Sequence, residues 1–223
     1  MVLVVAGLIG SCVSDLQSVD ASGIAWALGF LLTCLSPLFA PLSASAAATL
    51  PKAVTWSFAV AALALLAPVT AGFAAPASAA ALAVVVWLAS LALQLLLACA
   101  HSLARTADPN VARVTITAVF AALSAAPLWL GHAAQLLGSQ SGWPSRIVAL
   151  SPAAHLGSAI DCDLLRLTWF YANTPIGGLR FDYPQFGSIV LSYTVATVLL
   201  LVCVQWVARR PGAKVLDLQF ARS

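Results

Sequence analysis

Residues Ala77–Ala100 read ASAAALAVVVWLASLALQLLLACA, an unbroken apolar run without Lys, Arg, His, Asp or Glu. A helix needs about 20 predominantly apolar residues to cross the hydrocarbon core of a bilayer. The run is long enough, and its one strongly polar side chain, Gln94, is neutral. We therefore predict a transmembrane helix over Ala77–Ala100.

The composition of the whole chain extends this interpretation. The 223 residues are 62% hydrophobic and 8% charged, with a mean hydropathy of +1.00. A soluble domain carries about 25% charged residues, so lipid must cover most of this chain. All seven acidic residues are Asp, and the net charge of +3 is spread over loops and the tail, which does not indicate nucleic-acid binding. Residues 1–223 are thus predicted to form a single all-α transmembrane domain.

Five further apolar runs flank the central one and bring the predicted number of membrane spans to six. The five are Val2–Ser14, Ile24–Leu42, Val54–Ala74, Val111–Gly131 and Ile189–Ala208. The first of them, Val2–Ser14, is short for a membrane span. Short loops rich in Lys and Arg remain in the cytoplasm. Lys52, Arg105 and the tail Arg209-Arg210 obey this rule if both termini are cytoplasmic. Residues 132–186 then lie outside, because long loops translocate regardless of their charge.

The external segment 132–186 differs from the rest of the chain. Residues 147–160 are moderately apolar but too short to span, and Ser151-Pro152 in their middle predicts two short helices. Irregular backbone at membrane depth persists only where protein or a water-filled cavity covers it. We therefore predict a re-entrant or interfacial helical pair that caps a translocation path. Its candidate gate residues are Ser151, Pro152, His155, Asp161, Asp163, Arg166 and Trp169.

The stretch Ala149–Leu156, ALSPAAHL, precedes the last predicted span. Together with six spans and cytoplasmic termini, it resembles the segment that begins the external helices of ABC type-2 exporter permeases. The resemblance covers most of the chain as topology and implies an integral protein of a bacterial-type inner membrane. It also implies that two six-span units pair, as two copies or as two homologous chains. Separate cytoplasmic ATPases would drive export of a substrate, and a lipid-like or hydrophobic one would suit walls this apolar.

The same resemblance implies where the ATPase would bind. The cytoplasmic loops at Ala48–Lys52 and Arg105–Asp108 would contact it, with Lys52, Arg105 and Asp108 as candidate residues. Residues 1–223 contain no GxxxxGK phosphate loop, so ATP and Mg²⁺ would belong to a partner chain. Two features depart from the family. An amphipathic helix does not precede the first apolar run, and the loop before Lys52 is nearly uncharged.

Two other classes of function remain open. A non-catalytic structural or anchor subunit of a larger membrane complex explains the low charge equally well, but it does not need a proline-broken external pair. An intramembrane enzyme is disfavoured because no catalytic set of residues stands at a recognisable spacing. The five cysteines and three histidines show no metal-ligand spacing, so no catalytic residue, metal or cofactor is assigned to this chain. Ion-driven transport is disfavoured because the spans lack ionisable side chains near their midpoints.

Overall fold

The computed structural model describes residues 21–40, 46–70, 72, 74–103, 108–137, 142–163, 179 and 181–209. The predicted span over residues 2–14 lies outside these ranges, as do the candidate residues Arg105, Arg166 and Trp169. Within the described ranges the chain is helical and contains no strand. The all-α fold class is therefore confirmed for this part of the chain.

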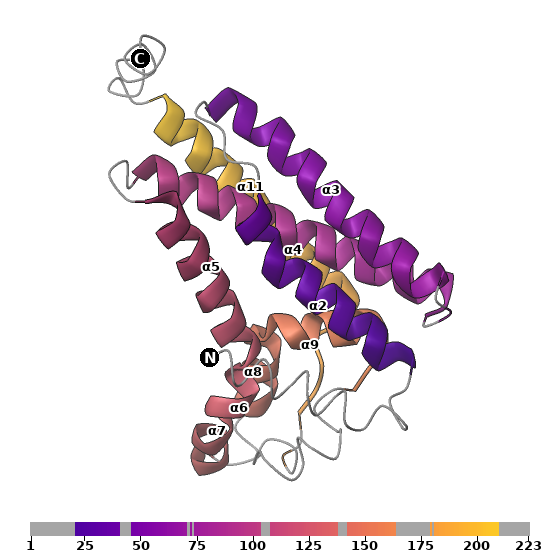
Figure 1. Cartoon of the computed structure of the whole chain (residues 1–223). Coiled ribbons are helices and arrows are strands. Elements are labelled where there is room, and N and C mark those ends of the chain that lie inside the picture. Colours follow the sequence, from indigo (N-terminus) through magenta and orange to yellow (C-terminus); the bar gives the residue numbers. More distant parts are fainter. Residues whose placement is uncertain are drawn as a thin grey trace.

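The described helices form a bundle of long helices with a group of short ones at one end (Figure 1). In chain order they are α2 (Ala21–Phe39), α3 (Ala46–Thr70), α4 (Pro76–Leu103), α5 (Pro109–Ser124), α6 (Ala126–Trp129), α7 (Gly131–Leu137), α8 (Trp143–Leu150), α9 (Pro152–Ala159) and α11 (Phe186–Ala208).

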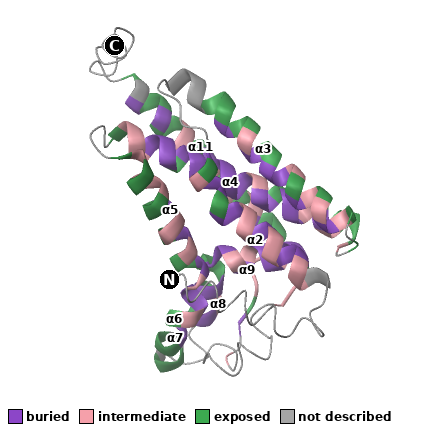
Figure 2. Cartoon of the chain, viewed as in Figure 1, coloured by how far each residue is buried: buried purple, intermediate pink, exposed green. Residues whose placement is uncertain are grey.

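Helix α4 is the centre of the bundle. It packs against α2, α3, α5, α9 and α11, and its buried Leu82, Val85 and Val86 belong to the main core. Figure 2 shows α4 largely in the colour of buried residues, whereas the neighbouring α3 carries more exposed ones. Close approach of α2 depends on Gly29, because a Cβ at this position would lie 3.0 Å from Leu82 Cδ1. Small residues at helix contacts are typical of packing in lipid, where backbones must approach closely.

Among the described residues, three helices are long and apolar enough to cross a membrane: Leu50–Thr70 of α3, Pro76–Leu103 of α4 and Phe186–Val207 of α11. The apolar part of α2, Gly23–Phe39, is shorter. Large apolar side chains are exposed along α3 and α11, among them Phe58, Leu63, Leu191, Val198 and Val202. Such surfaces are stable in hydrocarbon and not in water, which places this chain in a membrane.

The bounds of α2, α4 and α11 differ from the predicted ones by up to three residues, and two other predicted segments differ by more. The loop predicted to end at Lys52 is helical from residue 46 onward, because α3 begins at Ala46 and runs through Pro51. The apolar run 111–131 is not one helix: α5 ends at Ser124, Ala125 is a turn, and the short α6 and α7 follow. Pro127 explains the break, since it has no N–H to donate and its ring collides with the carbonyl four residues earlier.

Candidate functional site

Ser151 joins the two short helices that the sequence predicts around Ser151-Pro152. Its backbone is extended (φ −87°, ψ 113°), so α8 ends there and α9 begins at Pro152. The Ser151 Oγ accepts a hydrogen bond from the Ala154 N–H at 3.4 Å and donates one to the Ser124 carbonyl at 2.8 Å. Serine is a preferred N-cap and proline a preferred first helical residue. This buried hydroxyl therefore starts α9 and also attaches it to the end of α5.

His155 connects α9 to two other helices. Its Nε2 lies 2.8 Å from the Ala149 carbonyl of α8, and its Nδ1 lies 3.2 Å from the Tyr193 hydroxyl of α11. Because a carbonyl only accepts, Nε2 must donate, and the neutral ring then accepts the tyrosine proton at Nδ1. Burial lowers the pKa of the His155 imidazole, whereas the bond to the Ala149 carbonyl acts in the opposite direction. The side chain thus ties the α8–α9 pair to the last long helix.

Two further hydrogen bonds complete the attachment of α9. The Trp26 indole N–H of α2 donates to the Ala153 carbonyl at 3.0 Å. The Ser158 hydroxyl donates to the Pro184 carbonyl, just before α11, at 2.8 Å. Polar contacts from α2, α5, α8 and α11 therefore all converge on one eight-residue helix.

The acidic gate candidates lie beyond the C-terminal end of α9. Asp161 is exposed and has a φ of 55°, a left-handed conformation that Asp tolerates better than most residues. Asp163 accepts a hydrogen bond from the Tyr183 hydroxyl at 2.7 Å. The structure therefore gathers Ser151, Pro152 and His155 in one contact region and places the two Asp residues at its edge.

The candidate ATPase-contact residues that the structure describes, Lys52 and Asp108, lie at the opposite end of the bundle (Figure 1). Lys52 is exposed near the start of α3. Asp108 is the N-cap of α5, where its Oδ1 accepts from the Asn110 N–H at 2.8 Å. No hydrogen bond or ion pair joins Lys52 to Asp108 within the described ranges. The two residues therefore lie at the same end of the bundle without contacting each other.

Arg113 is a residue of this end whose role the sequence did not reveal. Its Nη2 donates to the Ala40 carbonyl at 2.7 Å, which places a cation at the C-terminal end of α2. Cations stabilise the unpaired carbonyls of a helix C-terminus. The contact also connects the start of α5 to the end of α2.

The two ends of the bundle differ in charge. We call them the Lys52 end, where α2, α4 and α11 terminate and α3 and α5 begin, and the α9 end, which holds α8 and α9 (Figure 1). Among the described residues, the Lys52 end carries three cations and one Asp, and the α9 end carries one Arg and three Asp. The former are Lys52, Arg113, Arg209 and Asp108; the latter are Arg146, Asp161, Asp163 and Asp182. The apolar middle separates them.

Gln94 takes part in a polar contact between long helices that sequence reasoning missed. Its Nε2 donates to the Ser36 Oγ of α2 at 3.2 Å, and the Trp56 indole N–H of α3 donates to the Ser36 carbonyl at 3.2 Å. Ser36 and Gln94 are buried. One serine therefore joins α2, α3 and α4. The isolated glutamine in an apolar run was the available signal, but its partner 58 residues away could not be identified from the sequence.

These contacts join the short helix α9 to the long helices of the bundle. Within the described residues, His, Cys, Asp and Glu side chains do not gather in groups of three that could hold a metal ion. A scan against protein-family models, a search of curated proteins and a search of solved structures found no match for this chain.

Proposed function

We propose that this chain is the membrane-spanning permease subunit of an ABC-type exporter. It moves a lipid-like or hydrophobic substrate by helix rearrangement that a separate cytoplasmic ATPase drives, with ATP and Mg²⁺ bound to that partner. The proposal includes six spans, pairing with a second copy or a homologous permease chain, and residence in a bacterial-type inner membrane. Both termini are cytoplasmic, and the α8–α9 pair lies in or on the outer leaflet.

The attachment of α9 is the observation that carries this proposal. A short helix pair that only anchored the chain would need no polar contacts with several long helices. Here Trp26, Ser151 and His155 link α9 to α2, α5 and α11 at the end far from Lys52. A rearrangement started at the Lys52 end would therefore change the position of α9. This is the coupling that an externally powered gate requires.

The charge distribution supports the proposed membrane orientation and the proposed energy source. Described short segments at the Lys52 end carry more Lys and Arg than Asp, as cytoplasmic segments do. The described parts of the three long membrane helices carry ionisable Lys or His side chains only near their ends, at Lys52 and His101. Helices with so few charges near the bilayer centre suit energy from ATP better than energy from an ion gradient.

The test is a pull-down of the tagged chain from membranes in mild detergent, followed by mass spectrometry and an ATPase assay. A co-purifying nucleotide-binding subunit with vanadate-sensitive hydrolysis is expected. Lys52→Glu should reduce its recovery severalfold, because the change reverses the charge of a predicted contact. Arg146→Glu is the matched control, since Arg146 is an exposed cation at the α9 end and should retain the ATPase.

Recovery of integral membrane partners without an ATPase would overturn the permease proposal. It would favour the second candidate, a non-catalytic structural subunit, for which the α8–α9 pair would be an assembly surface. Equal loss of the ATPase in both variants would contradict the assignment of Lys52 as a contact residue. It would not contradict the permease proposal.

A further inference from the structure

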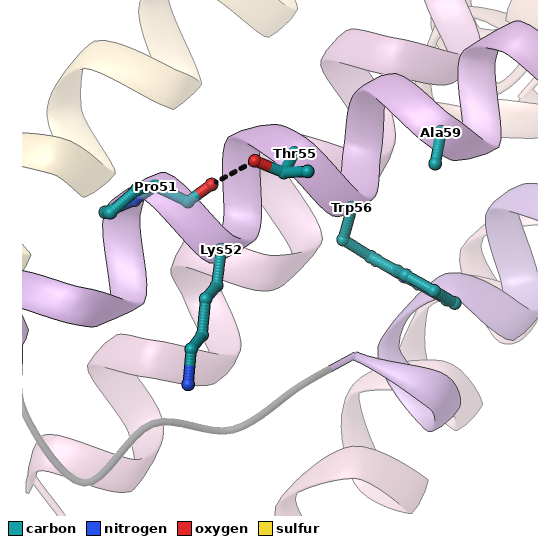
Figure 3. Close-up of a pocket in the computed structure, with 5 residues that line it drawn as sticks. All are labelled: Pro51, Lys52, Thr55, Trp56 and Ala59. Carbon is teal, nitrogen blue, oxygen red and sulfur yellow. Dashed lines mark hydrogen bonds between the residues drawn. The ribbon is translucent and has the colours of Figure 1, made fainter.

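A groove of about 300 Å³ lies on one face of α3 near the Lys52 end. The described residues that line it are Pro51, Lys52, Thr55, Trp56 and Ala59. These positions follow the spacing of one helix face, so the groove runs about 12 Å along the helix axis. Figure 3 shows the Lys52 and Trp56 side chains projecting from the same side of α3.

With α3 crossing the bilayer over Leu50–Thr70, the groove extends from the headgroup level into the hydrocarbon. Lys52 is the third residue of the membrane-crossing part of α3, Leu50–Thr70, and Ala59 is almost two helical turns deeper. A lysine at the end of a transmembrane helix extends its ammonium group to the headgroup level. The groove therefore has a cationic mouth and an apolar interior.

The other side-chain donors of the described lining already form hydrogen bonds within the protein. The Thr55 hydroxyl donates to the Pro51 carbonyl at 2.8 Å, and the Trp56 indole N–H donates to the Ser36 carbonyl at 3.2 Å. Among the described residues, no carboxylate forms an ion pair with Lys52. Among the described lining residues, the Lys52 ammonium is thus the side-chain donor that has no hydrogen-bond acceptor. A ligand that matches it has an anionic group joined to an apolar chain.

We infer that this groove binds one anionic phospholipid of the surrounding membrane. The lipid phosphate lies at the Lys52 ammonium, and an acyl chain follows α3 past Trp56 to Ala59. The inference depends on the membrane location of α3 and not on transport, so it can fail or succeed independently of the proposed function.

The test is native mass spectrometry of the delipidated chain titrated with phosphatidylglycerol or with phosphatidylcholine. The chain should retain one phosphatidylglycerol in preference to phosphatidylcholine. Lys52→Gln should weaken this binding about fivefold, the effect of one cation at a membrane surface, and Lys52→Arg should preserve it. Arg146→Gln is the control and should leave the phosphatidylglycerol titration unchanged.

Ala59→Leu provides a second variant that keeps the charge. The larger side chain occupies the apolar part of the groove and should reduce phosphatidylglycerol retention, although Ala59 is exposed and its replacement does not disturb the core. Retention of the ATPase by Ala59→Leu in the pull-down would separate lipid binding from ATPase contact at Lys52.

Three results would overturn the inference. The first is equal binding of the two lipids, and the second is a Lys52→Gln variant that binds like Arg146→Gln. The third is displacement by free glycerol phosphate, which would indicate a site for a soluble anion with no part for the acyl chain.

Discussion

At the scale of single residues, His155 shows how one side chain can report on the position of three helices. Its two ring nitrogens contact Ala149 of α8 and Tyr193 of α11, while its backbone belongs to α9. The His155 and Tyr193 rings also meet edge to face with centroids 5.5 Å apart. The imidazole can keep both hydrogen bonds only while the three helices hold this arrangement.

The depressed pKa of His155 predicts that acid weakens the α9 end. Burial keeps the folded-state pKa below the ordinary value of 6.5, so the folded chain binds fewer protons than the unfolded chain in mild acid. The contribution of neutral His155 to the free energy of unfolding is complete above pH 6.5. It is lost as the pH falls through that value toward the folded-state pKa. Thermal unfolding in detergent should therefore occur at a lower temperature near pH 5.5 than near pH 7.5.

His155→Gln should reduce this pH dependence, because the group that gains the proton is gone. His132→Gln is the matched control, since His132 is exposed on α7. Equal pH dependence in the wild type and in His155→Gln would contradict the assignment.

At the scale of helices, the junction at Ser151 determines where α9 begins and what holds it. The hydroxyl both caps α9 and donates to the last residue of α5. The extended backbone at Ser151 and the ring of Pro152 prevent α8 from continuing as one helix. The junction therefore links a break in the chain to a fixed attachment point.

Ser151→Ala should lower the free energy of unfolding by about 1–2 kcal/mol, because it removes an N-cap and leaves the buried Ser124 carbonyl without this donor. The measurement is unfolding by sodium dodecyl sulfate titration in micelles, followed by circular dichroism. Ser192→Ala is the control: that exposed hydroxyl bonds to the Ser188 carbonyl of its own helix at 2.8 Å. Its loss should change the free energy by less than about 0.5 kcal/mol. Equal effects of the two changes would mean that Ser151 does not hold α9.

At the scale of the whole molecule, the proposed membrane orientation rests on the separation of charge between the two ends of the bundle. The Lys52 end and the α9 end lie at opposite ends of the same long helices, with α3, α4 and α11 crossing between them (Figure 1). Lys52 and Arg146 are exposed on opposite sides of this apolar layer. The bundle can therefore place them in different aqueous compartments.

Single cysteines test this arrangement in a chain whose native cysteines are replaced by Ala. Arg146→Cys should react with a membrane-impermeant maleimide on intact cells or spheroplasts. Lys52→Cys should react only after permeabilisation, because it faces the cytoplasm in the proposed orientation. Labelling of both positions from one side would contradict a bundle that crosses the membrane. Reversed sidedness would leave the spans intact but would place the ATPase contact at the wrong end.

Much of the secondary structure follows from the sequence alone. The length and composition of the apolar runs determine where α3, α4 and α11 form, because a helix is the means by which an isolated chain satisfies its backbone in lipid. Ser151-Pro152 determines the break between α8 and α9, because proline has no N–H to continue the helix and its ring collides with the preceding turn. Pro127 carried an equally local signal for the break after α5, but the continuous apolar run obscured it.

The arrangement of the helices required the tertiary structure. Helices α4 and α11 are similarly apolar, with mean hydropathies of 2.4 and 2.2, yet 78% of the most apolar part of α4 is buried and only 17% of that of α11. Hydropathy cannot separate them, because lipid and protein interior are equally apolar solvents for a side chain. The contacts of the candidate site are also long-range, since Trp26 and Ala153 are 127 residues apart and His155 and Tyr193 are 38 apart. The sequence by itself therefore determined that the long apolar segments are helical and that the chain breaks at Ser151-Pro152. The early start of α3 at Ala46, the break after α5, the central place of α4 and the pairing of the polar groups required the tertiary structure.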